Sequence, residues 1–153
     1  MKTIKKTFSK LFFLEDRFCY DIEETKKDKF TGEKTFRTSI LNGINFTKIV
    51  SQEGAITYYL GAEVYGNIRV ADRKGVHILF EDGSKLSKPD EEIDVEVHDA
   101  ETYVYYAFVM ITAKELKILS EKLITDTRTH IFDSEIDKES AFIIREHAKC
   151  LLK

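Results

Sequence analysis

The sequence predicts an α+β fold: a predominantly antiparallel β-sandwich or partly closed barrel with two C-terminal helices. Residues 76–111 contain four runs of β-branched, aromatic or alternating residues, and turn residues separate these runs. Beyond them, apolar residues recur at helical spacing over residues 112–122 and 135–152. The length of 153 residues fits one domain, so we expect a single domain over residues 1–153.

The first half of the chain is expected to supply further strands. Apolar residues alternate with polar ones over residues 18–22, which predicts a strand, and the polar stretch 25–35 predicts a loop. Asn42-Gly43 predicts a tight hairpin turn, because both residue types tolerate a positive φ. Gly61 and Gly66 predict a bulge or a sharp bend beside the apolar residues that precede them.

The central stretch begins with a second hairpin signal. Asp82-Gly83 predicts a two-residue type I′ turn, which would pair residues 78–81 with residues 84–87. Pro89 lacks a backbone donor and is expected to end the second strand of this hairpin.

Two more strands are predicted after Pro89. In Ile93–Val97 the apolar residues share one face and the acidic residues share the other, which is typical of a strand with one face in water. Tyr103–Ile111 is apolar on both faces, which indicates a central strand that is covered on both sides. A buried helix is the alternative for Tyr103–Ile111, but its β-branched and aromatic content favours the strand.

The last third of the chain predicts helix, strand and helix. Thr112 and Glu115 have the spacing of a capping box, so the first helix is expected to begin there. Residues 125–133 are rich in threonine and predict a returning strand. Asp133 or Ser134 is expected to cap the last helix, and His147 lies on its apolar stripe as a core histidine.

The net charge of −3 gives the chain no general attraction to nucleic acid, and we expect no nucleic-acid partner. The charge is uneven: residues 1–50 hold 11 Lys/Arg and 7 Asp/Glu, whereas residues 51–111 hold 5 and 12. A solvated acidic face explains the acidic middle block. The alternative is an acidic patch that meets a basic partner, such as another copy of the chain.

Cellular location is predicted from the cysteines and the N-terminus. Cys19 and Cys150 are far apart and lack metal-site spacing, so we expect two small buried thiols and no disulfide framework. No apolar run has the length of a membrane span or of a signal peptide, which predicts a cytoplasmic protein. Residues 1–14 predict a short amphipathic helix packed on the sheet, with weak peripheral membrane contact as the alternative.

Sequence motifs for nucleotide binding, metalloproteases and serine hydrolases are absent, so no cofactor is expected. His77, Glu96 and His98 form the best candidate catalytic set, because two imidazoles and a carboxylate on one wet sheet face suit acid/base chemistry or a metal. Nothing in their spacing requires a metal, so no metal site is predicted. The alternative reading of these residues is a solvent-facing row that keeps the strands soluble.

Three aromatic residues are candidates for binding a partner. Tyr103 and Tyr105 lie in the tyrosine-rich strand, and tyrosine suits recognition surfaces because it is large, stiff and half polar. Phe142 falls outside the apolar stripe of the last helix. We therefore expect a non-catalytic binding or assembly module that self-associates or binds a protein partner. The alternative is a small metal-dependent or acid/base hydrolase that uses the His/carboxylate cluster, so the sequence leaves open whether the protein is an enzyme.

Overall fold

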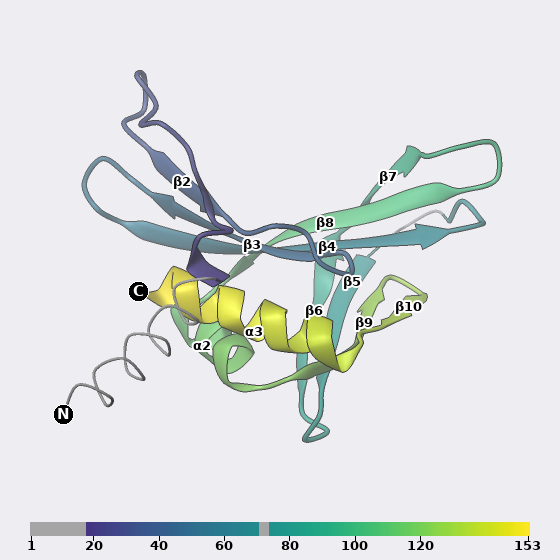
Figure 1. The fold of residues 1–153 in the computed structure, drawn as a ribbon. Coiled ribbons are helices and arrows are strands. Elements are labelled where there is room, and N and C mark those ends of the chain that lie inside the picture. Colours follow the sequence, from purple (N-terminus) through teal and green to yellow (C-terminus); the bar gives the residue numbers. More distant parts are fainter. Residues whose placement is uncertain (1–17, 71–73) are drawn as a thin grey trace.

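The computed structural model describes residues 18–70 and 74–153, which form two separate antiparallel sheets and two helices (Figure 1). Sheet A has the strand order β1-β2-β3-β4-β8-β7, and sheet B has the order β10-β9-β5-β6. The strands of sheet A are β1 (Glu23–Glu24), β2 (Lys34–Arg37), β3 (Ile44–Val50), β4 (Ile56–Gly66), β7 (Asp94–Val97) and β8 (Tyr103–Ile111). The strands of sheet B are β5 (Lys74–Phe80), β6 (Lys85–Glu92), β9 (Ile124–Thr129) and β10 (Phe132–Glu135), and the helices are α2 (Ala113–Glu121) and α3 (Lys138–Leu152).

The predicted α+β class with antiparallel sheets is confirmed, and the sheets do not close into a barrel. One detail differs from the prediction, because α2 lies between β8 and β9 and only α3 is C-terminal. Both helices lie on the same side of sheet A, and we call the opposite side of this sheet its outer face (Figure 1).

The core lies between the inner faces of the two sheets and the helices. Alternate residues of β4 and β8 point inward and are buried, among them Leu60, Ala107 and Val109. The ring of Tyr105 on sheet A lies 4.8 Å from the ring of Phe132 on sheet B, so aromatic packing joins the two sheets. One contiguous apolar cluster therefore includes both sheets and both helices.

Residues 103–111 form a strand as predicted, and β8 lies inside its sheet between β4 and β7. The prediction that both of its faces are covered is wrong. Phe108 and Met110 point to the outer face and remain 53% and 58% exposed. The sequence indicated correctly that this segment is a strand. Which of its faces is covered depends on segments that are distant in the sequence, so the exposure of one face could not be predicted.

The two predicted hairpins both form, with different turns. Asn42 and Gly43 have φ angles of 48° and 77°, as a tight turn with two positive φ values requires. In the second hairpin Glu81 joins Asp82 and Gly83 in the loop, and the amide of Phe80 donates to the carbonyl of Ser84. The pairing is consequently shifted by one residue from the predicted one.

Pro89 does not end its strand, contrary to the prediction. β6 continues to Glu92, because it is the edge strand of sheet B and the missing proline donor faces no neighbouring strand. The pairing of β6 with β5 becomes irregular between Lys74 and Val76, where Gly75 has a positive φ. This β-bulge accommodates the proline within the strand.

The glycines of β4 permit close approach instead of creating a bulge. β4 pairs continuously with β3 and β8. A Cβ at Gly61 would lie 1.8 Å from Oδ1 of Asn45, and a Cβ at Gly66 would lie 2.7 Å from Cζ of Phe132. Residues 68–70, which follow β4, form no strand.

Helix α2 begins as predicted, with a complete capping box between Thr112 and Glu115. Helix α3 begins later than expected, because Asp137 caps it and neither Asp133 nor Ser134 does. The stretch predicted as one strand over residues 125–133 is instead the β9–β10 hairpin, and His130 turns the chain with a φ of 59°.

The chain segment that enters the fold is not the predicted strand. Phe18 and Cys19 are helical, and the first strand begins only at Glu23. Cys19 forms a disulfide with Cys150 in the last turn of α3, so the prediction of two free thiols is wrong. Spacing along the sequence carried no signal for this bond, because the fold brings together two residues that are 131 positions apart. The amphipathic helix predicted for residues 1–14 lies outside the described residues.

None of the described helices is long and apolar enough to cross a membrane. The cytoplasmic location stays a prediction, and the disulfide weighs against it, because structural disulfides are rare in reducing compartments.

Candidate functional site

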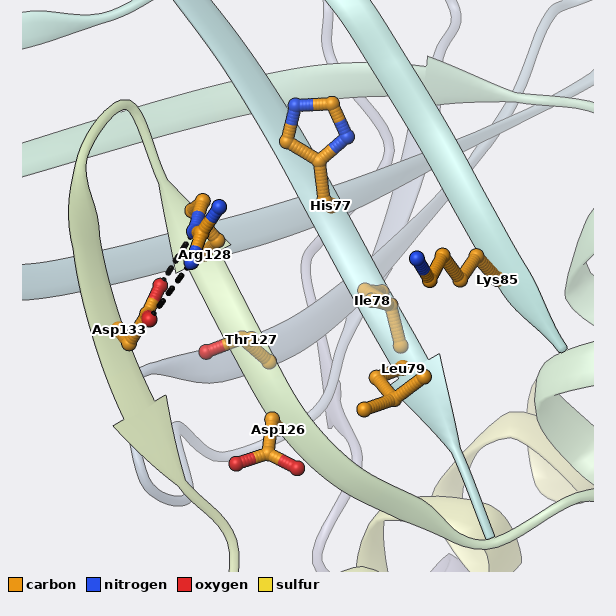
Figure 2. A pocket seen from close by; sticks show the side chains of 8 residues that line it. All are labelled: His77, Ile78, Leu79, Lys85, Asp126, Thr127, Arg128 and Asp133. Carbon is orange, nitrogen blue, oxygen red and sulfur yellow. Dashed lines mark hydrogen bonds and ion pairs between the residues drawn. The ribbon is translucent and has the colours of Figure 1, made fainter. Parts of the chain in front are cut away.

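A groove with a volume of about 330 Å³ lies on the face of sheet B that points away from the core (Figure 2). Cross-strand pairing places the side chains on this face in two rows. The rows are Ser87, His77, Arg128 and Asp133, and Lys85, Leu79, Asp126 and Glu135. Central strand β5 therefore forms the floor of the groove, with charged side chains on both sides of it.

One ion pair is built into the wall of the groove. The guanidinium of Arg128 donates two hydrogen bonds to the carboxylate of Asp133, and the Nη2–Oδ2 distance is 2.8 Å (Figure 2). This pair lowers the pKa of Asp133 and raises the pKa of Arg128. Because the charges of Arg128 and Asp133 neutralise each other, the pair forms part of the groove wall but adds little net charge to the groove.

Three other groups in the groove have no hydrogen bond or ion pair within residues 18–70 and 74–153: His77, Lys85 and Asp126. His77 and Asp126 are half-buried, and Lys85 is exposed. An imidazole, an ammonium and a carboxylate are thus available to a ligand. The groove can accept a small polar molecule that carries both positive and negative groups.

The predicted catalytic set is not brought together. His77 lines the groove of sheet B, whereas Glu96 is on β7 of sheet A and accepts a hydrogen bond of 3.0 Å from the hydroxyl of Tyr106. His98 follows β7, is exposed, and contacts the ring of Tyr65 edge-on at 5.0 Å. Among the described residues no three His, Cys, Asp or Glu side chains cluster in a way that could hold a metal ion.

The predicted binding residues are mostly occupied by internal contacts. Tyr105 is fully buried, and its hydroxyl donates to the carbonyl of Ile68. Tyr103 is half-buried against the core. Phe142 is 41% exposed, but its ring contacts Phe18 edge-on at 5.7 Å and lies beneath the Arg145 guanidinium. Phe142 therefore has a partner within the chain, which secures the entering segment to α3.

The opposite side of β8 carries an aromatic surface. Phe108 stacks on Tyr59 of β4 with ring centroids 4.3 Å apart and an interplanar angle of 9°. Met110 pairs with Tyr59 across the two strands and is 58% exposed. We call these three residues on the outer face of sheet A the aromatic platform. No described segment covers them, so they form a continuous apolar contact area.

Three carboxylates lie beside the aromatic platform. Glu63 and Asp94 flank Tyr106 in one cross-strand row, and Glu96 accepts the Tyr106 hydroxyl hydrogen bond. This hydrogen bond and burial raise the pKa of Tyr106, with smaller contributions from the charges of Glu96 and Asp94. The outer face thus combines an apolar centre with a negatively charged side.

The sequence indicated only part of these sites. The two-residue period of the strand places Tyr106, Phe108 and Met110 on one side of β8, and this could be predicted from the sequence. The exposure of that side to solvent could not be predicted. Lys85, Asp126 and Glu63 gave no signal, because single charged residues on strands are common. Their significance arises from pairings with strands far away in the sequence.

No known family model matches this chain, and no match emerged among curated proteins or solved structures. The function must therefore be inferred from the sites themselves.

Proposed function

We propose that this chain is a non-catalytic assembly module that binds a second copy of itself through the outer face of sheet A. One observation carries the proposal: the aromatic platform of Tyr59, Phe108 and Met110 is exposed on a sheet face without a covering segment among the described residues. Contiguous exposed apolar area of this kind, with polar residues at its margin, is typical of protein interaction sites.

The distribution of charge favours a second copy as the partner. Residues 51–111, which supply β4 to β8, carry 5 Lys/Arg and 12 Asp/Glu, whereas residues 1–50 carry 11 and 7. Three of these acidic residues, Glu63, Asp94 and Glu96, lie on the outer face of sheet A beside the aromatic platform. The acidic outer face of one copy is therefore complementary to the basic N-terminal third of another. Complementary charge of this kind selects the partner and accelerates association more than it adds affinity.

Sedimentation of the full-length chain over a range of concentrations tests the proposal. Wild type is expected to dimerise or to form larger assemblies, and the double variant Phe108→Ser/Met110→Ser to dissociate about tenfold more readily, since two exposed apolar side chains lose their contact area. The matched control is Phe30→Ser/Ile131→Ser, which removes two exposed apolar residues elsewhere. A wild-type monomer at all concentrations, or equal loss in the control, contradicts the proposal.

The groove of sheet B supports a second candidate function, acid/base hydrolysis of a small polar substrate. His77 lies there as a half-buried imidazole without a side-chain partner among the described residues, and Asp126 lines the same groove in the neighbouring cross-strand row. A panel of p-nitrophenyl esters and phosphates tests this function. Turnover that His77→Ala abolishes and His98→Ala preserves supports it, whereas turnover that is absent or insensitive to His77→Ala removes it.

A further inference from the structure

The outer face of sheet A has a dimple with a volume of about 160 Å³ beside the aromatic platform. Its floor is Gly61, where any side chain would collide with the Asn45 amide. Its walls include the rings of Tyr106 and Phe108 and the side chain of Glu63. The dimple therefore offers apolar walls, an amide oxygen and a carboxylate to one inserted side chain.

The chemistry of the dimple selects a cation. Glu63 is half-buried and has no ion pair or side-chain hydrogen bond within the described ranges. Asp94 and Glu96 add two carboxylates on the far side of the Tyr106 ring, and an aromatic ring attracts a cation through its face. A lysine or arginine can place its aliphatic stem along Phe108 while its charged end meets Glu63.

The chain itself contains a segment of matching chemistry, residues 1–17. This segment carries 5 Lys/Arg and 2 Asp/Glu, a surplus of three positive charges, whereas residues 18–50 carry 6 and 5. Most of the basic surplus of the N-terminal third therefore lies in residues 1–17. The same segment contains large apolar residues at close spacing: Ile4, Phe8, Leu11, Phe12, Phe13 and Leu14. It thus supplies positive charge that can meet the carboxylates of the outer face and apolar side chains that can pack on the aromatic platform.

We infer that residues 1–17 of one copy bind the outer face of sheet A of a second copy, with a lysine side chain in the dimple beside Glu63 and apolar side chains on the aromatic platform. This inference rests on the proposed self-association and names the segment that carries it.

The point of attachment of the segment favours a second copy over its own sheet. Residue 18 packs against Phe142, and Cys19 is bonded to Cys150, so the described chain begins on α3. α3 lies on the inner side of sheet A, opposite the outer face (Figure 1). To reach its own outer face the segment must pass around an edge of sheet A, whereas a neighbouring copy can present that face directly.

A charge-swap experiment on full-length protein tests the inference. Glu63→Lys places a positive charge in the dimple, and Lys2→Glu/Lys5→Glu/Lys6→Glu reverses the charge of the segment. Each variant alone is expected to weaken self-association on the order of tenfold, because like charges then meet. An equimolar mixture of the two variants is expected to recover association, since the reversed segment of one copy fits the reversed dimple of the other.

The control is Glu135→Lys, which makes the same charge change on exposed β10 of sheet B and should leave association unchanged. Circular dichroism verifies that each variant is folded. Recovery in the mixture supports binding between copies. No recovery in the mixture overturns the inference, and so does normal association of both variants. If the charge-swap result overturns the inference but Phe108→Ser/Met110→Ser still dissociates the assembly, self-association through the outer face stands and only the role of residues 1–17 is rejected. A wild-type protein that stays monomeric contradicts both the proposed function and this inference.

Discussion

A buried imidazole without a hydrogen-bond partner has a cost that depends on pH. His147 on α3 is only 3% exposed, and its Nε2 atom is buried without a hydrogen bond in the described part of the chain. The sequence predicted that His147 is a core histidine. Burial is confirmed, whereas residues 18–70 and 74–153 supply no hydrogen bond to the ring. Burial lowers the pKa of His147 below its usual value of 6.5, and the charge of Asp21 offsets part of this effect.

The lowered pKa predicts that the fold weakens in mild acid. As the pH falls below 6.5, the unfolded chain takes up a proton at His147 while the folded chain does not, so the free energy of unfolding decreases. Above pH 6.5 both states are neutral at this residue and the effect is absent. His147→Leu is expected to reduce the slope of the unfolding free energy against pH below 6.5, measured by urea denaturation. His98→Gln, at an exposed site, is the matched control, and an equal slope in His147→Leu and wild type contradicts the prediction.

At the residue scale the sequence predicted turns better than exposure. Asn42-Gly43 specified its own hairpin, because a two-residue turn with positive φ at both positions depends on local sterics alone. Asp82-Gly83 carried the same signal, yet the loop took in Glu81 and moved the pairing by one residue. The difference reflects packing of the flanking strands, which a dipeptide does not encode.

Helix α2 links local capping to tertiary contact. Glu115 accepts from the amide of Thr112 and also bonds Lys88 of β6 at 2.9 Å, while the Thr112 hydroxyl accepts from the Glu115 amide. The capping box therefore also attaches the start of the helix to the edge strand of sheet B. This arrangement adds a long-range ion pair to an interaction that the sequence alone identified.

Removal of the cap is expected to lower stability by about 1 kcal/mol. Thr112→Ala leaves the Glu115 amide without its side-chain acceptor, and chemical denaturation measures the loss. Lys114→Ala, which changes an exposed residue in the same turn, serves as the control and should have little effect. Equal stability of Thr112→Ala and wild type would show that solvent replaces the cap fully.

Element boundaries were predictable where local chemistry decides them. The capping box fixed the start of α2, whereas the end of β6 was misplaced because Pro89 is tolerated on an edge strand. The β9–β10 hairpin was missed because His130 adopts the positive φ that glycine or asparagine usually provides. Edge position and a turn residue with a positive φ are properties of the folded sheet, so neither could be inferred from the sequence.

The whole molecule is closed by the bond between Cys19 and Cys150, which joins residues 131 positions apart. A bond across so long a loop restricts the unfolded chain strongly. In the chain-entropy model a loop of this size contributes on the order of 4–5 kcal/mol to stability. The contribution disappears wherever the thiols are kept reduced.

Reduction is therefore expected to destabilise the fold by several kcal/mol. Urea unfolding with and without dithiothreitol measures the difference in wild type. The double variant Cys19→Ser/Cys150→Ser should match reduced wild type and should not respond to the reductant. Unfolding curves that coincide in the presence and absence of dithiothreitol would contradict the prediction.

The candidate interaction sites are also a property of the whole molecule, because strand pairing brings their residues together. Glu63, Tyr106 and Asp94 share one row only because β4, β8 and β7 pair in this register. His77 lies in a groove with Asp126 because β5 and β9 are neighbours. The sequence identified His77 and the tyrosine-rich strand as candidates, but it grouped them with residues that the sheets separate.

The bond between Cys19 and Cys150 also determines how the protein responds to mechanical force. A pull on the first and last residues is transmitted through the two sulfur atoms, because they connect the ends of the described fold. While the bond is intact, residues 20–149 form a covalently closed loop that carries none of the tension. Stretching can then extend only the segments outside the loop, and both sheets remain mechanically shielded until a reductant opens it.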